Sequence, residues 1–320
     1  MNPTVSVIIP CFNYGRFLRE AVASIQRQTF ADHETIVVDD GSVDDTEAVA
    51  RDLGAAVRYI RQPNQGPSAA RNTGIAAARG RYIGFLDADD IWHPEKLARQ
   101  VSILEGRPEV VLVYADATYF DAATGQELGR HRERFVHVEG RILRPLIEAG
   151  NFIPSPTPLA RRTTLDDLGG FDPTLRSSED WDLWLRLAAR GEVAYVDESL
   201  ARYRVHGAQA SRNIDALRDG QLRVLGKVMA AGDTRITGAD VRRALRTVWV
   251  DCGLCHLSLG NYGEARRNLV RAVLTDPRML SDPRLTVRML LSLGGGGLFG
   301  FARAMRRVVG QLQRQAVALK

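Results

Sequence analysis

Short runs of β-branched residues alternate with amphipathic segments through the first 120 residues, and this alternation restricts the fold more than any other feature. The runs that we expect to be strands are Val5–Pro10, Glu34–Asp39, Val57–Gln62, Arg81–Leu86 and Val110–Phe120. The segments with helical spacing between them are Arg16–Gln28, Asp45–Leu53, Ser68–Arg79 and Pro94–Leu104. Strand–helix alternation of this kind implies right-handed crossovers. The predicted fold class is therefore α/β, with a mostly parallel sheet flanked by helices.

The second half of the chain changes from mixed to helical character. Ser178–Arg190 has the apolar stripe of a half-buried helix, and we expect two short strands after it, Val193–Asp197 and Leu200–Val205. From about residue 212 onward the pattern is helical throughout. We therefore expect a domain over residues 1–210 and an all-helical extension over 211–320.

Residues 239–277 of the extension resemble one tetratricopeptide-type helical hairpin, with its turn at Gly260–Gly263. A single unit of this kind cannot bury its own apolar face, so we expect it to pack on the larger domain. Cys252 and Cys255, followed by His256, match the spacing of a haem attachment motif, but they lie inside this helical pattern.

Charge is distributed unevenly along the chain. Residues 1–200 carry 22 Lys/Arg against 30 Asp/Glu, and residues 201–320 carry 21 against 8. A basic half suggests an anionic partner, either nucleic acid or a membrane surface. No nucleic-acid-binding motif is present, whereas arginines flank the uncharged stretch 289–302, which is too short to span a bilayer. We expect no nucleic-acid partner and a basic C-terminal helix in peripheral contact with anionic membrane. The alternative is a packed helix with a solvated basic face.

The cysteine content and the N-terminus bear on the compartment. Three cysteines are too few for a disulfide framework, and no signal peptide is visible ahead of the first strand. We expect a cytoplasmic protein, peripheral on the inner face of the cell membrane if the tail binds lipid.

Polar motifs follow four consecutive predicted strands. They are Pro10–Asn13, Asp39–Ser42, Asn64–Gly66 and Asp87–Asp90. Open α/β sheets bind ligands at the carboxyl ends of their strands, so these motifs predict one shared crevice.

The last of these motifs places three carboxylates within four residues. Each like-charged pair about 5 Å apart would cost roughly 3 kcal/mol, and a phosphate would be repelled as well. A divalent cation removes this repulsion, and carboxylate oxygens beside a diphosphate suit Mn²⁺ or Mg²⁺. The alternative is a solvated turn whose aspartates only cap a helix.

Together these motifs resemble family 2 glycosyltransferases, which are inverting enzymes of the GT-A fold, in particular those that build bacterial surface glycans. The resemblance covers roughly residues 3–210. It rests on Val5–Pro10, Val38–Ser42 with Asp44 and Thr46, Asn64–Gly66 with Ala70–Asn72, Phe85–Asp90 and Ser178–Trp181. It implies a nucleotide-diphospho-sugar transferase fold and transfer of one sugar from a UDP-, dTDP- or GDP-sugar.

The resemblance also implies roles for individual residues. Asp40 or its neighbour Asp39 would hydrogen-bond the base, and Pro10 would frame the base pocket. Arg71 would lie against the nucleotide, and Asp87 would reach the ribose.

The resemblance further assigns Asp89 to the metal and Asp180 to catalysis. Inversion requires a general base that removes a proton from the acceptor hydroxyl, and a helix N-terminus would keep such a carboxylate ionised. The alternative for Asp180 is a charge that only stabilises its helix. His206 would complete the metal or diphosphate site, or else be a packing residue.

Two other functions compete with this interpretation. A nucleotidyltransferase would share the sheet, but it would carry a Gly-rich basic loop where this chain has Pro10–Arg16. A non-catalytic helical-repeat interaction protein would not need the acidic motifs. A processive synthase is disfavoured because its Gln-x-x-Arg-Trp motif is missing. The expected acceptor is a glycan, in particular a lipid-linked oligosaccharide.

Overall fold

The computed structural model describes residues 2–207, 209 and 213–281. The predicted basic C-terminal helix lies outside these residues. The chain divides into two compact units, Met1–Arg212 and a second unit that begins at Asn213, and each is described by itself.

The first unit contains a sheet of nine strands within the described residues, in the order β3-β2-β1-β4-β8-β6-β9-β5, with β7 paired to β6. The strands that pair in parallel are β1 (Val5–Cys11), β2 (His33–Asp39), β3 (Arg58–Arg61), β4 (Tyr82–Phe85), and β6 (Val110–Asp121) with β9 (Glu192–Val205). The antiparallel strands are β5 (Ile91–Trp92), β7 (Glu127–Arg130) and β8 (Leu159–Arg161). The expected α/β class with its five leading strands is confirmed.

Two strands expected near residue 200 form one long strand instead. β9 runs from Glu192 to Val205, and its register against β6 shifts around Asp116. The exposed Asp197–Glu198 pair lies at this shift, where an irregularity lets two charged residues face solvent without ending the strand. The polar interruption in the sequence therefore marks a bulge rather than a turn.

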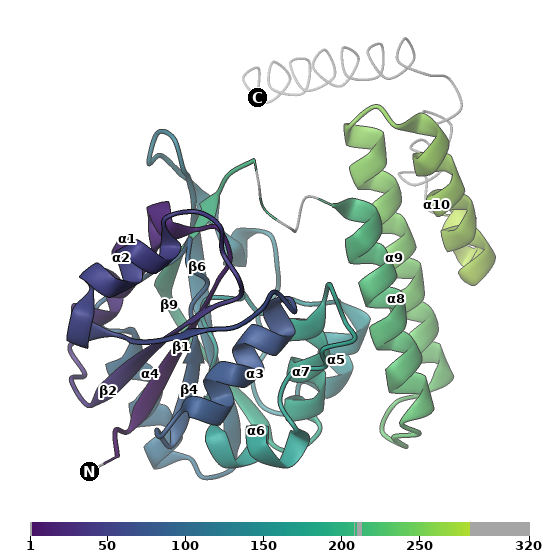
Figure 1. Ribbon diagram of the computed structural model, residues 1–320. Helices are drawn as coiled ribbons and strands as arrows, with labels where there is room; N and C mark the ends of the chain where they lie inside the picture. Colours follow the sequence, from purple (N-terminus) through teal and green to yellow (C-terminus); the bar gives the residue numbers. More distant parts are fainter. Residues whose placement is uncertain (1, 208, 210–212, 282–320) are drawn as a thin grey trace, which may run out of the picture. The chain divides into compact units, whose positions relative to one another are not determined.

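Helices cover the sheet on either side. They are α1 (Gly15–Gln26), α2 (Thr46–Asp52), α3 (Pro67–Ala77), α4 (Lys96–Gly106), α5 (Leu143–Glu148), α6 (Arg162–Leu168) and α7 (Glu179–Ala188). In Figure 1, α3 lies in front of the sheet, with α6 and α7 beside it. A Cβ on Gly74 would stand 2.4 Å from Ile8 Cγ2, so this glycine lets α3 lie directly on β1. This close contact holds α3 against β1, with the N-terminal end of α3 at the carboxyl ends of the strands.

The described part of the second unit, residues 213–281, contains α8 (Ile214–Ala230), α9 (Gly238–Ser258), α10 (Tyr262–Thr275) and a short 3-10 helix at Pro277–Ser281. A capping box between Thr237 and Asp240 starts α9. Gly253 lets α10 approach closely, because a Cβ there would lie 2.8 Å from Leu269 Cγ. Among the residues that the structure describes, none of the helices has the length and apolar character needed to cross a membrane.

Candidate active site

The loops after β1 and β2 are tied together at the carboxyl edge of the sheet. The backbone N–H of Asp40 donates to Cys11 O at 2.8 Å. The backbone N–H of Asn13 donates to Ser42 Oγ at 2.9 Å, and the backbone N–H of Val43 donates to Asn13 Oδ1 at 2.8 Å. Pro10 pairs with Val38 one residue before β1 ends. Hydrogen bonds therefore hold the two loops together, and Pro10, which is predicted to frame the base pocket, lies just before the first of them.

Asp39 and Asp40 are both buried and both hydrogen-bonded within the protein. Asp39 accepts from Ser42 N at 2.8 Å and from Tyr59 Oη at 2.6 Å. Asp40 accepts from the side chain of Gln62 and from two backbone N–H groups, those of Gln65 at 2.9 Å and Gly66 at 2.7 Å. These bonds shape the Asn64–Gly66 loop that leads into α3.

Arg71 links the predicted site carboxylate Asp87 to Glu179, the neighbour of Asp180. It projects from α3 with 8% of its surface exposed, and donates to Asp87 Oδ1 at 2.8 Å and to Glu179 Oε1 at 2.7 Å. Burial disfavours the charge of Arg71, but the two carboxylates outweigh burial and raise its pKa. One guanidinium group thus connects the end of β4 with the start of α7.

Asp89 and His206 meet at the same edge of the sheet. Nε2 of His206 lies 2.9 Å from Asp89 Oδ2, although the two residues are 117 positions apart. The imidazole packs against the rings of Tyr14 and Phe17. The separation is close to that of neighbouring ligands with metal bonds of about 2.1 Å. The structure thus brings together the two residues that were assigned to the metal.

The three carboxylates of the Asp87–Asp90 motif carry more negative charge than their surroundings balance. Burial and then the charge of Asp87 raise the pKa of Asp89. Burial, Asp89 and Asp87 raise the pKa of Asp90 well above its usual value, against the opposing effect of Arg204. Asp90 accepts from the backbone N–H of Arg204 at 2.8 Å and so anchors the end of β9. The carboxylate of Asp89 and the imidazole of His206 are the kinds of ligand that a divalent cation takes, and the neighbouring carboxylates add negative charge that would favour one.

Asp180 lies in the first turn of α7, next to Glu179, as predicted. Its Oδ1 accepts from Trp181 N at 2.7 Å and its Oδ2 from the side-chain amide of Asn151 at 2.9 Å. Burial, followed by the charge of Glu179, raises the pKa of Asp180 to about 6. The pKa of this carboxyl group therefore lies about one pH unit below neutrality, and the group is mostly ionised at pH 7. Nothing in the sequence pattern pointed to Asn151.

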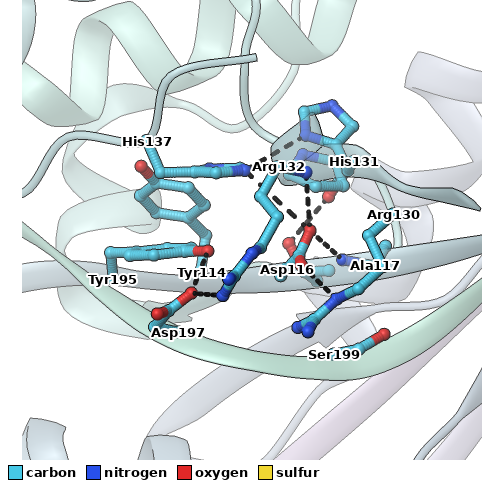
Figure 2. A network of polar contacts seen from close by, with 12 residues as sticks. Tyr114, Asp116, Ala117, Arg130, His131, Arg132, His137, Tyr195, Asp197 and Ser199 are labelled. Atoms are coloured by element: carbon cyan, nitrogen blue, oxygen red, sulfur yellow. Dashed lines mark hydrogen bonds and ion pairs between the residues drawn. The ribbon is translucent and has the colours of Figure 1, made fainter. Parts of the chain in front are cut away.

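A second polar cluster surrounds Asp116 on β6 (Figure 2). Ligand atoms of Asp116, His131 and His137 lie within 4.8 Å of one another, a spacing that a metal ion could use. Burial lowers the pKa of both histidines, that of His131 to about 4, so both are neutral at pH 7. Both oxygens of Asp116 already accept hydrogen bonds, from Ala117 N, Arg132 N and Arg130 Nε. These bonds tie the segment 130–138 to the sheet.

A mostly parallel sheet with carboxylates and a histidine gathered at its strand ends defines a protein of the GT-A class. Glycosyl transferase family 2 matches residues 6–166. The chain is 31% identical over 257 residues to an uncharacterized glycosyltransferase of Rickettsia typhi, covering 75% of this chain and 79% of that one. It is 30% identical to "Putative teichuronic acid biosynthesis glycosyltransferase TuaG" of Bacillus subtilis, covering 66% of this chain and 83% of TuaG. The chain belongs to glycosyltransferase family 2.

Solved structures share the fold. S. aureus TarS, residues 1–349, in complex with UDP-GlcNAc, superimposes with a TM-score of 0.61 at 16% identity, covering 91% of this chain and 88% of that one. The mannosyltransferase PcManGT from Pyrobaculum calidifontis, in complex with GDP-Man and Mn²⁺, gives 0.60 at 17% identity, covering 92% and 85%. Some relatives are longer, and the chain spans 31% of the length of one from Rickettsia bellii. The comparisons confirm the GT-A fold predicted from the motifs.

Proposed function

We propose that this chain is an inverting, metal-dependent glycosyltransferase that moves one sugar from a nucleotide-diphosphate sugar to an acceptor hydroxyl. The observation that carries the proposal is the Arg71 bridge. It connects Asp87, beside the Asp89–His206 pair, with Glu179, beside Asp180. This bridge supports a single site in which Asp87 would contact the donor and Asp180 would remove the acceptor proton. The TarS and PcManGT structures, which contain UDP-GlcNAc and GDP-Man, support a nucleotide-sugar donor.

The donor side would be formed by the loops after β1, β2 and β4. Pro10 and the Asp39–Asp40 pair would frame the base, with Asp40 acting partly through the Gln65–Gly66 backbone that it holds. Asp87 would reach the ribose, and Arg71 would steady both Asp87 and the nucleotide. Asp89 and His206 would hold Mn²⁺ or Mg²⁺. When bound, this ion supplies positive charge that offsets the charge developing on the leaving diphosphate.

The acceptor side would centre on Asp180. The acceptor oxygen attacks the anomeric carbon as the carbon–oxygen bond to the diphosphate breaks, and Asp180 takes the proton of the attacking hydroxyl. The raised pKa of about 6 suits this role, because the group is ionised at pH 7 yet basic enough to accept a proton. Attack opposite the leaving group inverts the anomeric centre.

A donor screen tests the proposal most broadly. The protein is incubated with UDP-, dTDP- and GDP-sugars, with Mn²⁺, with Mg²⁺ or with excess EDTA, and released nucleotide is measured. We expect turnover that requires the ion. Asp89→Asn should abolish turnover and weaken binding of the nucleotide diphosphate, whereas Asp167→Asn, an exposed carboxylate on α6, should leave both unchanged. Full activity in EDTA would contradict metal dependence.

The acceptor is proposed to be a glycan, in particular a lipid-linked oligosaccharide. The naming of the relative TuaG for teichuronic acid biosynthesis supports a surface-glycan acceptor. With a labelled donor sugar, label should move into the organic phase when a lipid-linked acceptor is supplied. Transfer to free oligosaccharide alone would restrict the acceptor to the glycan portion.

A further inference from the structure

Asn151 contacts the proposed catalytic carboxylate from outside its helix. It lies between α5 and β8, and its Nδ2 donates to Asp180 Oδ2 at 2.9 Å. Its Oδ1 accepts from the backbone N–H of Ile153 at 3.2 Å. This second bond uses the carbonyl end of the amide and fixes its orientation, so that the NH₂ group faces Asp180.

The amide is held rigidly by the residues beside it. Phe152 and Ile153 are each 2% exposed, and the indole N–H of Trp181 donates to Leu146 O in α5 at 3.0 Å. The segment that carries Asn151 and the first turn of α7 are therefore packed together. Locked neighbours of this kind keep a functional side chain within a narrow range of positions.

The contact bears on both the orientation and the charge of Asp180. Trp181 N donates to one carboxylate oxygen and Asn151 donates to the other, so the carboxylate is held in one orientation between two donors. Donors of this kind favour the ionised carboxylate, as does the positive charge of Arg71 from α3. Burial, the neighbouring Glu179 and the charge of Asp87 at the end of β4 favour the protonated form. Removal of the amide would shift this balance toward protonation and free the side chain to rotate.

We propose that Asn151 is the positioning residue of the catalytic base. It orients Asp180 toward the acceptor hydroxyl and keeps it ionised at neutral pH. The inference rests on the proposed role of Asp180 as the base, and it adds a residue from a loop in which the sequence shows no recognisable motif.

The isosteric variant Asn151→Asp gives the sharpest test. It keeps an oxygen for the Ile153 N–H, but it places a second carboxylate where the donor stood, and two carboxylates at such a distance share a proton. The acid limb of the pH profile of kcat/KM should move up by about two pH units or more. Asn151→Ala, which removes the donor, should move the limb up by about one to two pH units. At pH 6.5 these shifts should lower kcat about 3- to 25-fold in Asn151→Ala and about 25-fold or more in Asn151→Asp, with partial recovery near pH 9 and an unchanged donor KM.

Controls separate this inference from the proposed function. Ser155→Ala alters the same segment and should keep the wild-type profile. If Asp180→Asn retains the wild-type rate, the assignment of the base itself is wrong. If Asp180→Asn is inactive while both Asn151 variants keep the wild-type pH profile, or lose rate equally at every pH, the positioning role alone is overturned. Should Asn151→Asp fail to fold, as judged by thermal unfolding, the profile of Asn151→Ala decides.

Discussion

Replacement of Arg71 by methionine tests whether the buried guanidinium balances the charge of the site. Methionine fills much of the same volume but leaves Asp87 and Glu179 without their shared partner. Removing one member of a buried ion pair costs about 3–5 kcal/mol. The Asp87 side chain is 29% exposed and the Glu179 side chain 12%, so solvent reduces the penalty. We expect a loss of about 3 kcal/mol of unfolding free energy at pH 7.5.

The pH dependence of this loss identifies its cause. Acid neutralises carboxylates, so the unbalanced negative charge left in the absence of Arg71 should matter less as the pH falls. The loss should therefore shrink to about half at pH 5. Arg71→Lys keeps the charge but cannot reach both carboxylates, and should give an intermediate loss.

Urea unfolding followed by the fluorescence of the buried Trp181 and Trp184 measures these differences. A loss below about 1 kcal/mol, or one that is equal at pH 5 and pH 7.5, would refute the electrostatic explanation and leave only lost packing.

Further predictions concern stability, the donor loop and the tail. Burial lowers the pKa of His131 to about 4, so below pH 6.5 the unfolded chain takes up a proton that the folded chain does not. Thermal unfolding should therefore show a loss of up to about 3 kcal/mol of stability between pH 6.5 and pH 4. The loss should be smaller in His131→Gln. If stability falls with pH as steeply in His131→Gln as in the wild type, this histidine is excluded as the cause. Asp40→Ala should lower the free energy of unfolding by about 3 kcal/mol and raise the donor KM, because the backbone N–H groups of Gln65 and Gly66 lose their acceptor. A normal donor KM would show that this loop does not contribute to donor binding. Truncation at residue 283 removes a part of the chain that lies outside the described residues. It should reduce co-sedimentation with anionic vesicles but not with zwitterionic vesicles. Equal recovery of the protein in the supernatant with either lipid would contradict a membrane role.

The strands and helices near the N-terminus were predictable because local sequence determines them. Buried β-branched runs such as Val5–Pro10 form strands wherever helices cover both faces of a sheet. β8 was not predictable, since Leu159–Arg161 is only three residues long and follows a Pro-rich stretch. Its place between β4 and β6 depends on pairing with both neighbours. Strands of this kind are defined by tertiary contacts and leave no periodic signal.

The site was predictable in its location but not in its contacts. Parallel strands bring Asp40, Asp87 and Asp89 to one edge, and this follows from the alternation of strands and helices. Two contacts depend on loop conformation. They are the hydrogen bond from the backbone N–H of Gly66 to Asp40 and the hydrogen bond from Asn151 to Asp180. Gly66 has φ 91°, which only a glycine adopts at little cost, but the sequence does not show which carboxylate its N–H reaches.

The rate of sugar transfer by Asp180→Asn, measured together with the affinity of this variant for the donor, decides whether Asp180 is the catalytic base. Asparagine has nearly the same shape but cannot take a proton from the acceptor. We expect the kcat of Asp180→Asn to be about 10²–10⁴-fold below that of the wild type, with donor affinity unchanged. A variant that transfers sugar at the wild-type maximal rate but binds the donor poorly would contradict the account, and would place Asp180 in donor binding.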